Sequence, residues 1–173
     1  GGTWSGTLTA RNAGTFHFAV VDSSSGFVSA RSRVVVSPAP PDRFTVSPDT
    51  LRLTAGVSDT ATVRVVDAFG NAAPLASPQT LTLWTDRPAG SFRNLSGSAI
   101  FEITLPAGAD SGQFLFRDTQ TTSSAGRVRA IDADGSSPFL GTAASYVLTV
   151  PAAPAGVIAL TASPDTLVAN GSD

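Results

Sequence analysis

One strand and the turn after it read Thr60-Ala61-Thr62-Val63-Arg64-Val65-Val66-Asp67-Ala68-Phe69-Gly70-Asn71. Ala61, Val63 and Val65 face one way, while the polar residues between them face the other. Such period-2 alternation is typical of a β-strand with one buried face. Gly70 and Asn71 accept positive φ, which favours a tight turn. The stretch therefore predicts a strand that packs on a core and reverses at its end.

The same alternation recurs along the chain, and Val, Thr, Phe and Ile are frequent. Further strands are predicted over residues 43–47, 51–54, 80–85, 99–105, 113–117, 126–132 and 145–150. In the strand over 99–105, Phe101 and Leu105 are predicted to point inward and Glu102 outward. Gly, Pro and Asp lie between the strands, and no amphipathic helix pattern of useful length is present. The pattern predicts an all-β fold, an antiparallel β-sandwich.

One motif occurs twice. Ser47-Pro48-Asp49-Thr50-Leu51 recurs 116 residues later as Ser163-Pro164-Asp165-Thr166-Leu167, a spacing of a whole domain rather than of a solenoid turn. Weaker matches pair residues 14–18 with 112–116, and residues 26–30 with 126–130. We therefore expect tandem repeats with partial units at both ends: 1–40 is the C-terminal part of a preceding repeat, 41–155 a complete repeat, and 156–173 the first strand or strands of a following repeat.

The first partial unit and the linkers follow the same scheme. Strands are predicted over residues 3–10, 15–21 and 27–37, matching the last strands of the complete unit. The connections over residues 37–41 and 151–154 are rich in proline, which favours stiff, extended backbone. Neighbouring units are therefore expected to sit end to end with limited bending.

Composition excludes several functions. The net charge is −2 and 14% of residues are charged, which gives no electrostatic attraction to nucleic acid. There is no cysteine, so no disulfide, thiolate metal site or thiol nucleophile can form. No stretch is long and apolar enough to insert into a membrane as a helix. All basic residues are arginine, so a lysine-dependent isopeptide cross-link is also excluded.

Residues 60–71 resemble the strand and turn of bacterial Ig-like domains of the invasin and intimin type. Those modules typically carry a valine-rich alternation, then Asp, two residues and Gly-Asn, as in Asp67-Ala68-Phe69-Gly70-Asn71. Residues 163–173 resemble the start of such a module. The resemblance implies an Ig-like β-sandwich from a tandem array in an extracellular stalk, adhesin or fibre shaft.

Two acidic segments contain aspartates of the kind that bind calcium. Asp67 in the turn is a possible ligand at a domain junction, but we expect it to cap the turn by accepting backbone N–H groups. Residues 132–136 read Asp-Ala-Asp-Gly-Ser, like the start of a calcium loop. The twelfth position is Ala143, where such a loop needs a glutamate, so a hairpin turn is the better prediction. No metal or cofactor site is predicted.

Catalytic residues are not predicted either. His17 is the only histidine and alternates with Phe16 and Phe18, which predicts an outer strand face. One histidine without cysteine assembles neither a transition-metal cluster nor a triad. Glu102, the only glutamate, is predicted to be a solvated residue rather than half of a glycosidase carboxylate pair.

Aromatic and basic side chains offer surface alternatives. Parity places Trp84 outward, next to Arg87, where the two would form an interaction patch. Ig-like sandwiches often bury a tryptophan on that strand, so we expect Trp84 to be buried. Trp4 can be core or surface. Three arginines that would form a basic strip across neighbouring strands are expected mainly to limit aggregation: Arg64, Arg127 and Arg129.

These observations predict a non-enzymatic structural repeat module of a secreted bacterial cell-surface protein, an adhesin stalk or an extracellular filament shaft. Its expected partners are neighbouring repeats of the same protein, possible other copies in a fibre, and an unknown host or surface ligand. One alternative is a receptor- or glycan-binding adhesin domain using loops such as residues 86–97. Another is a fibre subunit assembled by strand exchange between the partial ends of two chains.

Overall fold

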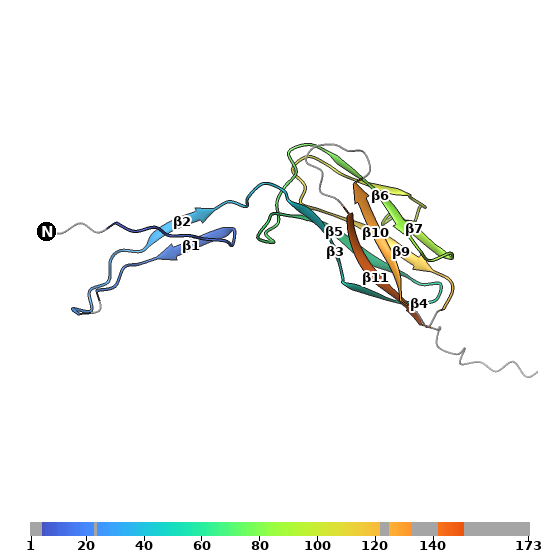
Figure 1. The fold of residues 1–173 in the computed structure, drawn as a ribbon, viewed down its shortest axis with the longest axis horizontal. Helices are drawn as coiled ribbons and strands as arrows, with labels where there is room; N and C mark the ends of the chain where they lie inside the picture. Colours follow the sequence, from blue (N-terminus) through green and yellow to red (C-terminus); the bar gives the residue numbers. More distant parts are fainter. Residues whose placement is uncertain (1–4, 23, 122–124, 133–141, 151–173) are drawn as a thin grey trace, which may run out of the picture.

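The computed structural model describes residues 5–22, 24–121, 125–132 and 142–150. It shows a two-stranded hairpin extending from a β-sandwich (Figure 1). The described strands are β1 (Gly14–Phe18), β2 (Ser32–Val36), β3 (Arg43–Ser47), β4 (Thr50–Thr54), β5 (Ser58–Val66), β6 (Gln79–Thr85), β7 (Gly90–Arg93), β8 (Glu102–Leu105), β9 (Ser111–Asp118), β10 (Gly126–Asp132) and β11 (Thr142–Val150). In the described part of the chain, no helix is long and apolar enough to cross a membrane.

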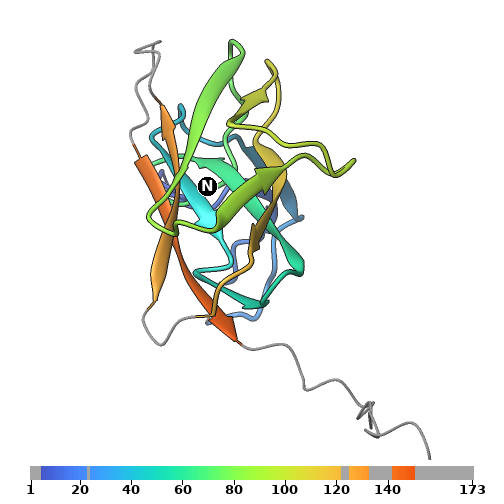
Figure 2. The same cartoon turned by 90° about the vertical axis from the view of Figure 1, so that its right-hand side faces the viewer.

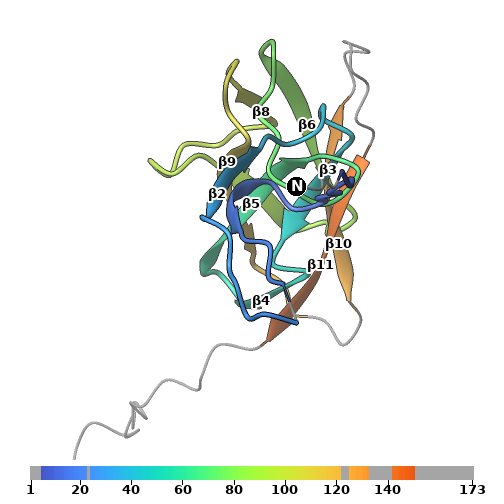
Figure 3. The same cartoon turned by 90° about the vertical axis from the view of Figure 1, so that its left-hand side faces the viewer.

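Two sheets form the sandwich. The five-stranded sheet has the order β4-β11-β10-β6-β8, and the four-stranded sheet has the order β3-β5-β9-β7. All neighbouring strands are antiparallel except β4 and β11, which are parallel. Figures 2 and 3 view this arrangement from its two ends. The predicted all-β sandwich is confirmed, whereas its division into tandem repeats stays a prediction, and residues 156–173 lie outside the described residues.

The core fills the space between the two sheets. Phe92 contacts Phe114 edge-on, with ring centroids 5.7 Å apart, and Phe116 at 5.2 Å. Aromatic pairs in these arrangements add to the stabilisation from burial. The cluster also contains a fourth phenylalanine, Phe44, and Leu75 from the connection between β5 and β6. Its other members are aliphatic residues on the strands: Val46, Leu51, Leu53, Ala61, Val63, Val65, Leu81, Leu83, Leu105, Val128, Ala130 and Val147. The alternation predicted over residues 60–66 is therefore confirmed, and its apolar residues form the inward face of β5.

The first copy of the repeated motif, residues 47–51, lies where the chain crosses between the sheets, and the second copy lies outside the described residues. β3 ends at Ser47 in the four-stranded sheet, and β4 begins at Thr50 in the five-stranded sheet. Pro48 has no N–H group to donate to a sheet ladder, which suits a break between strands. Leu51 then enters the core and is fully buried. The motif thus ties together the two layers of the sandwich.

The prediction for residues 99–105 was wrong at its start. β8 begins only at Glu102, and Phe101 is 80% exposed. Ala99 forms an isolated bridge with Arg93 of β7, which belongs to the four-stranded sheet. Three residues later, Glu102 pairs with Thr82 of β6 in the five-stranded sheet. The chain changes sheets between these residues, so the alternation does not continue through them. β7 lies within residues 86–97, which the sequence predicts to be a loop, and the connection from β7 to β8 projects sideways from the sandwich (Figure 2).

The hairpin keeps fewer strands than predicted. β1 pairs with β2 from Gly14 opposite Val36 to Phe18 opposite Ser32. Residues 5–10 form no strand, and the region over 26–30 contributes one isolated bridge, between Val21 and Val28. In the sandwich, β9 has a neighbour on each side, whereas in the described residues β1 has only β2. Missing neighbours explain why similar sequences form less regular structure here.

Candidate functional site at the linker junction

Asp67 lies at the end of β5, where the linker from the hairpin meets the sandwich, and its side chain is fully buried. Its Oδ1 accepts hydrogen bonds from the backbone N–H groups of Phe69 (2.9 Å) and Asn71 (2.8 Å). Its Oδ2 accepts from the backbone N–H of Ala39 (2.9 Å) and from Asn71 Nδ2 (2.8 Å). One carboxylate therefore caps the turn and holds the proline-rich linker.

Backbone hydrogen bonds and one positive φ define the turn after β5. Asp67 N–H donates to Asn71 O at 2.9 Å, and Gly70 N–H donates to Asp67 O at 3.0 Å. Gly70 has φ of 88°, in the left-handed region that side chains with a Cβ avoid. The predicted turn over residues 68–71 is therefore confirmed, as is the capping role of Asp67.

The hydrogen bonds also determine the charge of Asp67. Burial alone raises the pKa of a carboxyl group. In Asp67 this effect is outweighed by the hydrogen bonds from Asn71, Ala39 and Phe69, which lower the pKa from 3.8 to about 2. Asp67 is thus a carboxylate at neutral pH, and its four donors satisfy it without a counter-ion.

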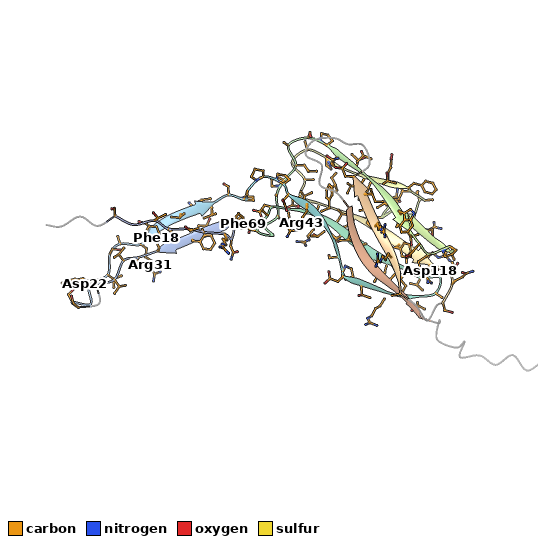
Figure 4. The ribbon with its side chains drawn as sticks, viewed as in Figure 1. Phe18, Asp22, Arg31, Arg43, Phe69 and Asp118 are labelled. Atoms are coloured by element: carbon orange, nitrogen blue, oxygen red, sulfur yellow. The ribbon has the colours of Figure 1, made fainter. Side chains whose placement is uncertain are left out.

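Asn71 extends the junction to the hairpin. Its Oδ1 accepts from Ala13 N–H at 2.9 Å, and its Nδ2 donates to Arg11 O at 2.8 Å. Phe69 and Arg43 lie at the end of the sandwich that faces the hairpin (Figure 4). Asp42 N–H donates to Val66 O at 2.9 Å, so the linker is fixed again where it enters β3. Residues far apart in the sequence are joined here through one turn.

The structure offers little for a calcium ion at this junction. Among the described residues, no group of three or more His, Cys, Asp or Glu side chains is placed to hold a metal. Both oxygens of Asp67 already accept N–H groups, which a cation would have to displace. The second acidic segment begins at Asp132, which is buried and accepts a bond from Gln79 Nε2 at 2.7 Å. Its remaining residues lie outside the described part, so the hairpin turn there stays a prediction.

The proposed patch of Trp84 and Arg87 does not exist. Arg87 turns inward, and its Nη2 lies 2.6 Å from Oδ2 of Asp118, which is fully buried. Gln120 O accepts from Arg87 at 3.0 Å, and Gln120 N–H donates to Asp118 at 3.0 Å. Asp118 lies toward the end of the sandwich away from the hairpin (Figure 4). Arg87 therefore fixes the connection between β6 and β7 from inside.

Trp84 is on the surface, contrary to the expected burial. It is 41% exposed and lies opposite Arg129 in the pairing of β6 with β10. The Arg129 guanidinium carbon is 4.8 Å from the centre of the indole ring, a cation–π contact. The alternation of side chains along the strand predicts this exposure correctly, because the inward positions of β6 are filled by Leu81 and Leu83. Trp4 lies outside the described residues.

The remaining sequence candidates lie apart. Arg64 is on β5 in the four-stranded sheet, whereas Arg127 and Arg129 are on β10 in the other, so no common basic strip exists. Glu102 is exposed on β8, as predicted. His17 is exposed on β1, also as predicted. Glu102 on β8 and His17 on β1 thus lie on different sheets of the described structure.

Comparisons with known proteins identify no family. No family model matches the chain, and no curated protein matches it. Among solved structures, domains 4 and 5 of the S-layer protein SbsC are 13% identical with a TM-score of 0.43, covering 80% of this chain and 58% of that one. A structure of surface layer protein SbsC domains 1–6 is 12% identical with a TM-score of 0.45, covering 79% of this chain and 19% of that one. The chain thus spans less than two thirds of either structure, and an invasin or intimin family is not shown.

Proposed function

We propose that the chain is a non-catalytic structural module of a bacterial cell-surface protein, an adhesin stalk or filament shaft, that holds neighbouring repeats at a fixed spacing. The observation that carries this proposal is the bond between Asp67 and Ala39. The buried carboxylate of Asp67 in the sandwich accepts a hydrogen bond from the backbone N–H of Ala39 in the linker. Such a contact limits rotation between units, which proline stiffness alone does not do.

The rest of the molecule supports a mechanical role. The described strands of the sandwich, β3 to β11, bury a continuous core of their own. Among the described residues, the buried carboxylates are those of Asp67, Asp118 and Asp132, and each has a hydrogen bond or ion pair that serves the fold. Length in such a protein comes from the number of copies rather than from chemistry at one site.

Spin labels provide the test of stiffness. Because the chain has no cysteine, labels attach only at introduced positions, Val35→Cys on β2 and Thr104→Cys on β8. We expect a narrow distribution of distances between them in the otherwise unchanged protein. Asp67→Ala should broaden it, whereas the control Asp59→Ala, at an exposed position, should not. A distribution that is already broad without Asp67→Ala would overturn the proposal.

Surface location requires a separate measurement. An antibody against the purified chain should label intact, unpermeabilised cells of the source organism. Labelling only after permeabilisation would contradict the extracellular part of the proposal and leave the mechanical part standing.

A second candidate function is favoured by Trp84. An exposed indole beside an arginine is a common contact for sugar rings and for protein partners. The alternative of a receptor- or glycan-binding adhesin domain would therefore use the outer face of β6 and β10. Binding on a glycan array that is lost in Trp84→Ala and kept in Phe101→Ala would support it. Equal binding by both variants, or none by the parent, would count against it.

A further inference from the structure

An apolar groove runs along one face of the hairpin. Its volume is about 290 Å³, and it is lined by Leu8, Phe16, Phe18, Val34 and Val36, among others. Because side chains alternate along paired strands, Thr15, Arg33 and Val35 belong to the opposite face of the hairpin, while His17 also lines the groove. The hairpin is therefore amphipathic, like one layer of a sandwich without the other.

The complete unit contains the same apolar residues in a buried setting. Gly14-x-Phe16-x-Phe18 matches Gly112-x-Phe114-x-Phe116 of β9, and Thr7-Leu8 matches Thr104-Leu105 at the end of β8. Leu105, Phe114 and Phe116 are at most 1% exposed. Their counterparts Leu8, Phe16 and Phe18 are 65%, 41% and 43% exposed. Among the described residues, the hairpin thus exposes side chains whose sequence counterparts in the sandwich are buried in the core.

The matched glycines Gly14 and Gly112 differ in what surrounds them. A Cβ on Gly112 would lie 2.4 Å from Leu105 Cδ2, so the close approach of β8 leaves no room for a larger residue. On Gly14 a Cβ would meet only Phe16 of its own strand, at 3.7 Å. Gly14 instead has φ of 145°, a backbone conformation that favours glycine, so its lack of a side chain is required by the backbone and not by a packed neighbour.

We propose that the groove and the free edge of β1 receive a strand of the β5 type from another copy of the repeat unit. β9 has β5 on one edge and β7 on the other, while within the described part of the chain β1 pairs only with β2. In the complete unit Ala61 lies opposite Phe114, and Val63 opposite Gly112. The same register would place an alanine opposite Phe16 and a valine opposite Gly14. This inference rests on the proposed repeat organisation and names the surface through which repeats are completed.

The occupant follows from the chemistry of the groove. A β5-type strand offers small and branched apolar residues on one face, and these fit against two phenylalanines. Its backbone would also satisfy the N–H and C=O groups on the open edge of β1, as in strand addition generally. An unrelated apolar ligand would fill the groove and leave that edge unpaired.

A peptide with the β5 sequence, residues 58–66, tests the proposal on the intact chain. We expect saturable one-to-one binding by fluorescence anisotropy, and at least tenfold weaker binding by Phe16→Ser and Val34→Ser. Phe27→Ser and Val35→Ser change exposed residues away from the groove and should bind as the parent does. A peptide of the same composition in scrambled order should not bind.

Hydrogen exchange locates the bound peptide. Protection gained over residues 14–18 supports the proposal, whereas protection gained over residues 111–118 would show invasion of the complete unit and overturn it. Absence of saturable binding, or equal binding by the scrambled peptide, overturns it too. The spin-label experiment on Asp67 does not involve this groove, so a stiff linker with no peptide binding would refute this inference alone.

Discussion

Arg87 and Asp118 form an ion pair within the sandwich, in which both Nη2 and Nε of the guanidinium approach Oδ2 of the carboxylate, at 2.6 Å and 2.7 Å. The Asp118 side chain is fully buried and that of Arg87 is 10% exposed. A buried pair differs from a surface pair in its energetics, because removal of one partner leaves an uncompensated charge.

Arg87→Ala should therefore destabilise the protein by about 3–5 kcal/mol, measured by urea unfolding. The matched control is Arg52→Ala, an exposed arginine on β4, which should cost less than about 0.5 kcal/mol. The double variant Arg87→Met with Asp118→Leu should recover much of the loss, since it removes both charges. A single Arg87→Ala variant as stable as the parent would contradict this account.

Asp67 makes stability depend on acid pH. Its pKa in the folded protein, about 2, is below the ordinary value of 3.8. Its contribution is therefore complete above about pH 4 and is lost as the pH falls towards 2. Asp67→Asn should be less stable than the parent at pH 7, and the gap should narrow between pH 4 and pH 2. Urea midpoints across this range provide the measurement, and a gap that stays constant would rule out the carboxylate as its source.

Phe114 and Phe16 offer a comparison of matched residues. Phe114→Ala empties a fully buried site and should cost about 3–5 kcal/mol. Phe16→Ala changes a half-exposed residue of the hairpin and should cost less than about 0.5 kcal/mol. Thermal unfolding of the two variants side by side checks the difference. Comparable losses would mean that the hairpin is packed far better than its exposure indicates.

Substitutions of Gly70 test the backbone conformation of the turn without steric crowding of a new side chain. No atom lies within 4 Å of a Cβ placed there, so any cost comes from its positive φ alone. Gly70→Ala should destabilise by about 1 kcal/mol, and Gly70→Asn by less, because asparagine tolerates the left-handed region better. Denaturant unfolding of both variants gives the order. An asparagine variant less stable than the alanine variant would show that another contact determines this residue.

Local patterns were sufficient for most of the fold. Strand alternation located β5, β6, β9 and β10, because each has one buried and one exposed face along most of its length. Turn chemistry predicted the capping role of Asp67 correctly, since an aspartate two residues before Phe69 and four before Asn71 is spaced to accept their N–H groups.

Features that depend on the third dimension were not predictable in this way. Phe101 follows an alternating pattern but lies where the chain moves between sheets. Arg87 and Asp118 are 31 positions apart with no motif to connect them, and Ala39 contributes to the junction only its backbone N–H. The expected burial of Trp84 came from a fold-level analogy, which the filled inward positions of β6 overrode.

The parallel pairing of β4 with β11 has a consequence for a protein under tension. Thr50 lies opposite Tyr146 and Thr54 opposite Val150, so the two strands run in the same direction. Force entering at Thr50 and leaving at Val150 pulls these strands lengthwise past each other, and their five residue pairs resist together. Antiparallel strands pulled from one end would instead unzip bond by bond. Stretching single molecules should therefore record the rupture of this edge as one abrupt event, and the sandwich would withstand a pull along its axis far better than a sideways one.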